Sequence, residues 1–335
     1  MEETKESIIF AATVPTTLPV EQRTTVGLRF FIIAVMNYNK QPIDFPQQLD
    51  ILRERGLIIT DENNALELLA SISYFRLASY WCSMEMGDEN TPHRFYPNTY
   101  FDDVVNLYVF DKELRTWVFN AIQDIEIALR TKIIHYFSLK HGTFWFMDNN
   151  LFKDENIHSH CLTSIKNELG RSKEEFIQEH FAKYDNPLFP PVWKTLEIVS
   201  FGTLSKLYCN MKDVEVKKQV AKSFHLPQYL FLENWIKAAS VLRNYCAHHA
   251  RLWNRRFPVI PKLPQELPLT WIDVRNVRPI KLYAQLCYLA YLEQSIKPNS
   301  AFSKEIVSLL STKPQRILKA MGFPPDWESE PLWQN

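Results

Sequence analysis

The most constraining feature of this sequence is a long run of apolar residues that recur at steps of three and four. Its members are Leu107, Phe110, Leu114, Val118, Ile122, Ile125, Leu129, Ile133 and Tyr136. Such steps place side chains on one face of a helix, so the run predicts a single helix of roughly 35 to 40 residues that Gly142 ends. No run of alternating apolar and polar residues, which would predict β-strands, accompanies it.

Other amphipathic stretches with the same period surround the long helix. They cover residues 156–169, 172–184, 192–209, 213–224, 228–255, 279–296 and 301–321. Upstream, two short helical stretches lie on either side of Gly56, and the Pro-rich segment 257–268 is typical of an extended connector. The sequence therefore predicts an all-α protein, a multi-helix bundle with a small N-terminal helical subdomain.

Composition changes along the chain and suggests boundaries. Residues 1–36 are rich in threonine and show no helical period, which predicts either a poorly ordered extension that adds little to the fold or an upstream start with Met36 as the alternative initiator. A loop at 88–102, with Pro92 and Pro97, is a reasonable second boundary. We expect an N-terminal helical subdomain at 37–97, a larger helical domain at 98–300, and a C-terminal helix and tail at 301–335.

Charge and glycine usage exclude several classes of function. The chain has 38 Lys and Arg residues and 38 Asp and Glu residues, so no net field attracts the whole molecule to nucleic acid or to a membrane. Its 7 glycines are too far apart to form a G-x-G-x-x-G turn or a P-loop. The longest apolar run, Phe30–Met36, is far shorter than the ~20 residues that cross a bilayer, so no membrane partner is expected.

The cysteines and histidines favour a cofactor-free protein. The 5 cysteines are scattered and never spaced as C-x-x-C, which favours a reducing cytoplasm and argues against a zinc ribbon. His158, His160 and Cys161 lie close together, but no second group at ligand spacing accompanies them, so a solvated loop is the preferred interpretation. We expect neither a metal nor another cofactor.

The stretch Ser240–Phe257, SVLRNYCAHHARLWNRRF, carries the strongest sign of chemistry. No acidic residue lies between Glu233 and Glu266, whereas basic residues are frequent there, which makes a local anion-binding patch. On a helix that turns by ~100° per residue, four polar side chains would share an arc of ~60°. These four are Asn244, His248, Arg251 and Arg255.

This set of side chains suits metal-free cleavage of RNA. An imidazole titrates near neutral pH and can move a proton, and a guanidinium matches the oxygens of a phosphorane. The RNA 2′-hydroxyl would be the nucleophile. We assign catalysis to Arg243, Asn244 and His248, and RNA binding to Lys237, Arg251, Arg255 and Arg256. The spacing alone leaves open a solvated surface or a buried capping network.

Several motifs resemble known families. RNYCAHH, with Arg243 and His248 at R-x4-H spacing, looks like the signature of HEPN-domain ribonucleases, which are helical and commonly dimeric. Over roughly residues 38–257 the chain resembles the Abi-like (abortive infection, AbiD/AbiF) family of bacterial phage-defence proteins. The resemblance is carried by KQPIDFPQQLDILRERGLII, SYFRLASYW, LYVFDKELR, IEIALRTKI, HG-x-FW and LRNYCAHHARLWNR. It implies a HEPN-type bundle and an RNase-like protein that limits phage by damaging RNA.

Three further groups of residues are candidates for smaller roles. Glu126 and Arg130 match the E-x3-[KR] pair that HEPN domains often carry on their first long helix, and we expect them to support the site from within ~20 Å of His248, two helix diameters. Asp111 and Arg115 have the same spacing, for which helix support is the preferred interpretation. The aromatic residues of the segment 74–81 (Tyr74, Phe75, Tyr80 and Trp81) are expected in the core.

Two classes of function remain open at this point. In the first, the chain is an endoribonuclease whose composite site forms at a homodimer interface. In the second, it is a non-catalytic helical module of a defence or toxin–antitoxin system that binds RNA or a partner protein. The expected partners are RNA, a second copy of the chain, and an antitoxin or small RNA regulator. Exposure discriminates between the classes, because catalysis needs Asn244 and His248 open to solvent.

Overall fold

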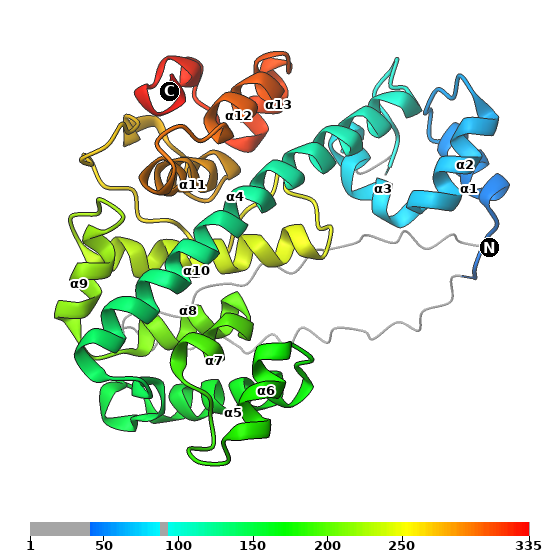
Figure 1. Ribbon diagram of the computed structural model, residues 1–335. Helices are drawn as coiled ribbons and strands as arrows, with labels where there is room; N and C mark the ends of the chain where they lie inside the picture. Colours follow the sequence, from blue (N-terminus) through cyan, green and yellow to red (C-terminus); the bar gives the residue numbers. More distant parts are fainter. Residues whose placement is uncertain (1–40, 88–92, 335) are drawn as a thin grey trace, which may run out of the picture. The chain divides into compact units, whose positions relative to one another are not determined.

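Helix α4, Phe101–His141, is the longest element of the computed structural model, which describes residues 41–87 and 93–334 (Figure 1). Two aspartates lie in its first turn and a Lys–His pair in its last turn, which suits the partial charges at the two helix ends. Gly142 follows with a φ of 83°, a conformation that glycine adopts without strain. The predicted long helix and its end are confirmed.

Thirteen α-helices make up most of the described residues, which contain isolated β-bridges but no strand. Besides α4 they are α1 (Phe45–Glu54), α2 (Glu62–Ile72), α3 (Tyr74–Trp81), α5 (Glu155–Arg171), α6 (Glu175–Lys183), α7 (Val192–Ile198), α8 (Phe201–Asn210), α9 (Val214–Lys222), α10 (Tyr229–Ala247), α11 (Leu282–Ile296), α12 (Phe302–Ser311) and α13 (Gln315–Met321). The predicted all-α fold class is confirmed.

Two of the predicted helices are each divided in two. The stretch 192–209 breaks at Val199, and Ser200 begins the next helix by accepting a hydrogen bond from the N–H of Thr203 (3.3 Å). The stretch 301–321 breaks just before Pro314, which has no N–H with which to continue a helix. Each break is marked by a local residue, the capping Ser200 or the helix-breaking Pro314, which the apolar period alone does not reveal.

Helix α11 lies at the centre of the core. Every side chain from Leu282 to Glu293 is buried, as expected of a helix that is apolar on all sides. Helix α4 packs against α10 and α11 and also contacts α3, α9 and α12 (Figure 1). The connection between α1 and α2 bonds directly to the start of α4, where the N–H of Phe101 donates to the carbonyl of Ile58 (2.9 Å). The described residues from Asp44 onward belong to one compact unit. The extension predicted at residues 1–36 lies outside the described residues.

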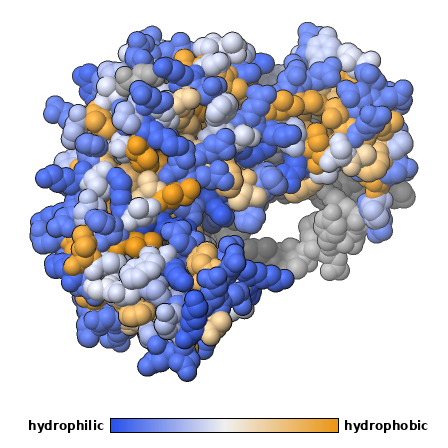
Figure 2. Space-filling model, in the orientation of Figure 1, coloured by the Kyte–Doolittle hydropathy of each residue, from blue (hydrophilic) through white to orange (hydrophobic). Residues whose placement is uncertain are grey.

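The face drawn in Figure 2 is mostly hydrophilic, with hydrophobic residues in separate patches. Phe75 on α3 is 89% exposed, so the core position predicted for it is wrong, and Tyr74 is only partly buried. Tyr80 and Trp81 are buried, as predicted. Among the described helices, none combines the length and the apolar character that crossing a membrane requires.

Candidate functional site

Helix α10 carries the motif residues at its C-terminal end. Its apolar side chains, among them Trp235, Ala239 and Leu242, are buried, and the helix packs against α4, α8 and α9. This packing fixes the helix and leaves its polar side chains at the surface. Arg243 and Asn244 lie in its last turn.

The helix ends at Ala247, eight residues before the predicted end at 255. His249 adopts the left-handed conformation, with a φ of 55°, and its N–H donates to the carbonyl of Cys246 (3.0 Å). The N–H of Ala250 donates to the carbonyl of Tyr245 (2.8 Å). These two bonds form a Schellman motif, whose left-handed position is usually glycine. A histidine in that position gives no sequence signal of a helix end.

Arg251 and Arg255 therefore do not share the predicted helix face, and that prediction is wrong. Both lie in the irregular segment after the turn, where the Nε of Arg255 donates to the carbonyl of Arg251 (2.5 Å). The guanidinium carbon of Arg255 lies 4.3 Å from the centre of the Tyr245 ring. Partial burial and the charge of Arg255 lower the pKa of Arg251. Arg255 is thus folded back on the end of the helix, whereas the guanidinium carbon of Arg251 lies 5.8 Å from the centre of the Trp253 ring.

The three residues assigned to catalysis lie together at the helix end. Asn244 and His248 are exposed, and the N–H of His248 donates to the carbonyl of Asn244 (3.0 Å). Arg243 is half-buried, with its guanidinium carbon 6.0 Å from the centre of the Phe119 ring on α4. An amide and an imidazole thus face solvent beside a guanidinium that leans on α4.

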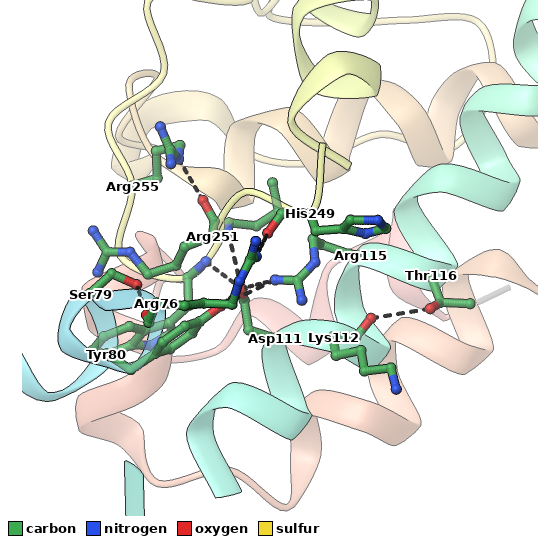
Figure 3. A network of polar contacts seen from close by, with 12 residues as sticks. Arg76, Ser79, Tyr80, Asp111, Lys112, Arg115, Thr116, His249, Arg251 and Arg255 are labelled. Atoms are coloured by element: carbon green, nitrogen blue, oxygen red, sulfur yellow. Dashed lines mark hydrogen bonds and ion pairs between the residues drawn. The ribbon is translucent and has the colours of Figure 1, made fainter. Parts of the chain in front are cut away.

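A buried carboxylate holds the chain just beyond these residues (Figure 3). Asp111 on α4 is fully buried and accepts hydrogen bonds from the backbone N–H groups of Leu252 (3.2 Å) and Trp253 (2.6 Å). The Tyr80 hydroxyl donates to the same carboxylate (2.7 Å), as does Nη1 of Arg115, one turn further along α4. We call these three side chains and two amides the Asp111 network.

The electrostatics of the Asp111 network follow from its burial. Burial raises the pKa of Asp111, and Arg115 and the hydrogen-bond donors around the carboxylate oppose that rise. Burial and the neighbouring carboxylate raise the pKa of Tyr80, so its hydroxyl stays protonated and donates. Burial also raises the pKa of Cys246 to about 12, so this thiol is not a nucleophile near neutral pH.

A second contact fixes the turn itself. Arg76 on α3 donates from Nη1 to the carbonyl of His249 (2.8 Å), and Figure 3 shows its side chain reaching across to that carbonyl. The chain around His248 is therefore held by α3 on one side and by Asp111 of α4 on the other.

Sequence reasoning missed this arrangement, because it assigned Asp111 and Arg115 to helix support. The network joins three of the motifs quoted above: SYFRLASYW through Tyr80, LYVFDKELR through Asp111 and Arg115, and LRNYCAHHARLWNR through Leu252 and Trp253. A signal was present, since Asp111 lies four residues after Leu107 and seven before Val118, on the apolar face of the long helix. A carboxylate on that face must find a buried partner.

Glu126 and Arg130 form the expected ion pair in the middle of α4. Nη2 of Arg130 donates to Oε1 of Glu126 (2.8 Å) and to the carbonyl of Val199 (3.0 Å), so the pair binds the connection between α7 and α8. Among the described residues, neither side chain forms a hydrogen bond or ion pair with Arg243 or His248. Their supporting role stays a prediction.

The remaining residues assigned to RNA binding are exposed. Lys237 lies on α10, 11 residues before His248, or roughly 16 Å along a helix axis at 1.5 Å per residue. Arg256 follows Arg255 in the irregular segment. Both are free to contact a phosphate, and their assignment stays a prediction.

The group formed by His158, His160 and Cys161 lies on α5 and not in a loop. His158 is buried, stacks on Phe152 (3.9 Å between ring centres) and bonds through Nε2 to the carbonyl of Phe146 (2.7 Å). The solvated-loop interpretation is therefore wrong, because these residues belong to a helix that packs on the core. In the part of the chain that the structure describes, no group of three or more His, Cys, Asp or Glu residues is placed to hold a metal.

Comparison with known proteins gives one family. A family model described as Abi-like protein matches residues 67–254, more than half of the chain. The match includes the Asp111 network, the Glu126–Arg130 pair and the whole motif from Arg243 to His248, but leaves out KQPIDFPQQLDILRERGLII at positions 40–59. No curated protein and no solved structure shows significant similarity to the chain.

Proposed function

This chain belongs to the Abi-like protein family, and from that premise we propose that it acts in abortive infection, a defence against phage, as a metal-independent endoribonuclease of HEPN type. The observation that carries the proposal is the exposure of Asn244 and His248 on a turn that Asp111 and Arg76 hold in place. A solvent-open imidazole on a backbone turn that is held in place, at the same helix end as a guanidinium, suits general acid–base chemistry on a phosphodiester.

The proposed reaction is a transesterification. The 2′-hydroxyl oxygen attacks the adjacent phosphorus and loses its proton, the bond to the 5′-oxygen of the next nucleotide breaks, and that oxygen gains a proton. The products are a 2′,3′-cyclic phosphate and a 5′-hydroxyl. His248 moves a proton, Arg243 stabilises the charge on the phosphorane oxygens, and Asn244 orients the phosphate through its amide.

A second function has one specific observation in its favour. Arg243 is half-buried and lies against Phe119, so part of its role is to hold α10 on α4. In a non-catalytic module, the same helix end would bind a structured RNA or a partner protein, such as an antitoxin. The first candidate predicts both RNA affinity and RNA cleavage, whereas the second predicts no cleavage, whether its ligand is RNA or a protein.

The deciding experiment is incubation of the purified full chain with total RNA in EDTA, followed by mapping of the new ends. We expect cleavage without a divalent ion and 2′,3′-cyclic phosphate ends, because the internal 2′-hydroxyl is the nucleophile. RNA that stays intact, or cleavage that requires a divalent ion, would reject the ribonuclease and favour the binding module.

We also propose that the chain forms a homodimer in which two motif helices face each other across a two-fold axis. One histidine cannot easily act as both the base and the acid of a single in-line transfer, whereas two copies supply two histidines. The cationic residues would then approach each other, so we expect the dimer to dissociate more readily at low salt. Light scattering at micromolar concentration measures this. A monomer at every salt concentration, with and without RNA, would contradict the proposal.

A further inference from the structure

A pocket of about 600 Å³ lies between α3, α4 and the end of α10. Tyr108 and Phe119 of α4 give it aromatic walls, and Cys246 and Ala247 add apolar surface from α10. His249, the left-handed residue of the turn, also lines it. The pocket therefore begins one residue away from His248.

Three cationic side chains surround this pocket. Arg76 and Lys112 are exposed, and Arg115 is only 6% exposed while it lines the pocket and holds Asp111 through Nη1. Among the described residues no aspartate or glutamate lines the pocket, since Asp111 is buried behind Arg115. Arg115 is paired with Asp111, whereas no acidic residue of the lining balances the charges of Arg76 and Lys112, so the pocket combines apolar walls with a net positive charge.

This combination selects the chemical class of the ligand. A flat apolar ring system fits against aromatic walls, and a negative charge fits the cations. Asn120, two helical turns beyond Lys112 on the same face of α4, adds an amide that can pair with the polar edge of a base. A nucleotide has all three features: a flat base, polar base edges and a phosphate.

We propose that this pocket binds the base of the nucleotide next to the cleaved phosphate of RNA. Phe119 links the two sites, because it lines the pocket while its ring centre lies 6.0 Å from the guanidinium carbon of Arg243. A base that stacks in the pocket against Phe119 would place its own phosphate toward Arg243. The identity of the ligand as an RNA strand rests on the proposed function, but its binding is measured without cleavage.

The test uses the full chain and a fluorescent oligonucleotide in which every ribose is 2′-O-methylated, so that no nucleophile is present and the probe cannot be cleaved. We expect Phe119→Leu, which keeps apolar volume but removes the aromatic face, to weaken binding about tenfold. Lys112→Ala should weaken it to a similar extent at low salt. Lys112 is exposed, so loss of this side chain leaves the fold intact. Phe181→Leu and Lys166→Ala, changes of the same type at exposed sites outside the pocket, should change affinity less than twofold.

The salt dependence of RNA affinity separates the electrostatic contribution of Lys112 from the stacking contribution of Phe119. Removal of one phosphate contact should lower the slope of log affinity against log salt by about 0.7 for a single strand, so Lys112→Ala should reduce the slope. Phe119→Leu should leave the slope unchanged, because stacking releases no counterion. Equal slopes in all variants, or unchanged affinity in Phe119→Leu and Lys112→Ala, would overturn the proposal.

A second arm distinguishes an RNA strand from a free nucleotide. Adenosine monophosphate is tested as a competitor of the oligonucleotide, and we expect only weak competition because it lacks the neighbouring phosphates. If adenosine monophosphate competes at the same concentration as the oligonucleotide, the pocket is a site for free nucleotides and the proposed RNA subsite is rejected.

The failure of the subsite can be told apart from the failure of the ribonuclease. If the pocket variants bind the oligonucleotide as tightly as the parent does, while the parent cleaves RNA, only the proposed subsite is wrong. If the pocket variants bind the oligonucleotide more weakly, while the parent does not cleave RNA, the ribonuclease proposal is wrong and the RNA subsite is supported.

Discussion

Replacement of His248 by alanine is expected to lower the rate of RNA cleavage in EDTA by about 10²- to 10⁴-fold, the usual contribution of a positioned acid or base. RNA affinity should change little, because the exposed imidazole of His248 makes no side-chain contact that the fold depends on among the described residues. Cleavage of a labelled RNA and fluorescence anisotropy measure the two quantities separately. His160→Ala, which removes an exposed histidine on α5, is the matched control and should retain the parent rate.

Arg243 should behave differently from His248. Its charge meets the phosphate in both the ground state and the transition state, so Arg243→Ala is expected to weaken binding and slow cleavage together. Arg243→Lys keeps the charge but loses the forked set of hydrogen-bond donors. Compared with Arg243→Ala, it should restore RNA affinity more fully than the cleavage rate. A folded His248→Ala variant that cleaves RNA as fast as the parent would remove the ribonuclease assignment and leave the binding module in its place.

The helical fold could be predicted because apolar periodicity is a local property. The nine apolar residues from Leu107 to Tyr136 predict a helix of roughly 35 to 40 residues that Gly142 ends, and α4 has 41 residues and ends at His141. Each step of three or four depends only on neighbouring turns. The end of α10 could not be predicted in the same way. It depends on the left-handed conformation of His249, which the sequence does not mark and which Arg76 of α3 holds through a carbonyl 173 residues away in sequence.

The candidate site was predictable in composition but not in arrangement. The spacing of Arg243, Asn244 and His248 identified a turn of helix, and the structure brings these residues together there. The carboxylate that positions the following segment was assigned to helix support, because an (i, i+4) pair looks the same whether it is exposed or buried. Only the tertiary fold reveals that Asp111 satisfies two amides of a segment about 140 residues downstream.

Replacement of Asp111 by alanine should be the most destabilising change in this region. It would leave the guanidinium of Arg115, which is 6% exposed, without its carboxylate, and the N–H groups of Leu252 and Trp253 without an acceptor. Breaking a buried ion pair costs about 3–5 kcal/mol of unfolding free energy. At about 2.1 cal/mol/K per residue, the unfolding entropy of 335 residues is about 0.7 kcal/mol/K, so the melting temperature should fall by roughly 4–7 °C. Asp50→Ala, which breaks an exposed pair with Arg53, should cost under about 0.5 kcal/mol.

A second variant separates the charge of Asp111 from its hydrogen bonds. Replacing both Asp111 and Arg115 with leucine removes the uncompensated charge, which for a buried ion pair alone is often neutral for stability. Here two backbone N–H groups would still lack an acceptor, at about 1–3 kcal/mol each. We therefore expect the double variant to recover only part of the loss in calorimetry, and to cleave RNA more slowly because the segment after His248 is no longer held. A double variant as stable and as active as the parent would show that Asp111 supports its own helix only and does not position the site.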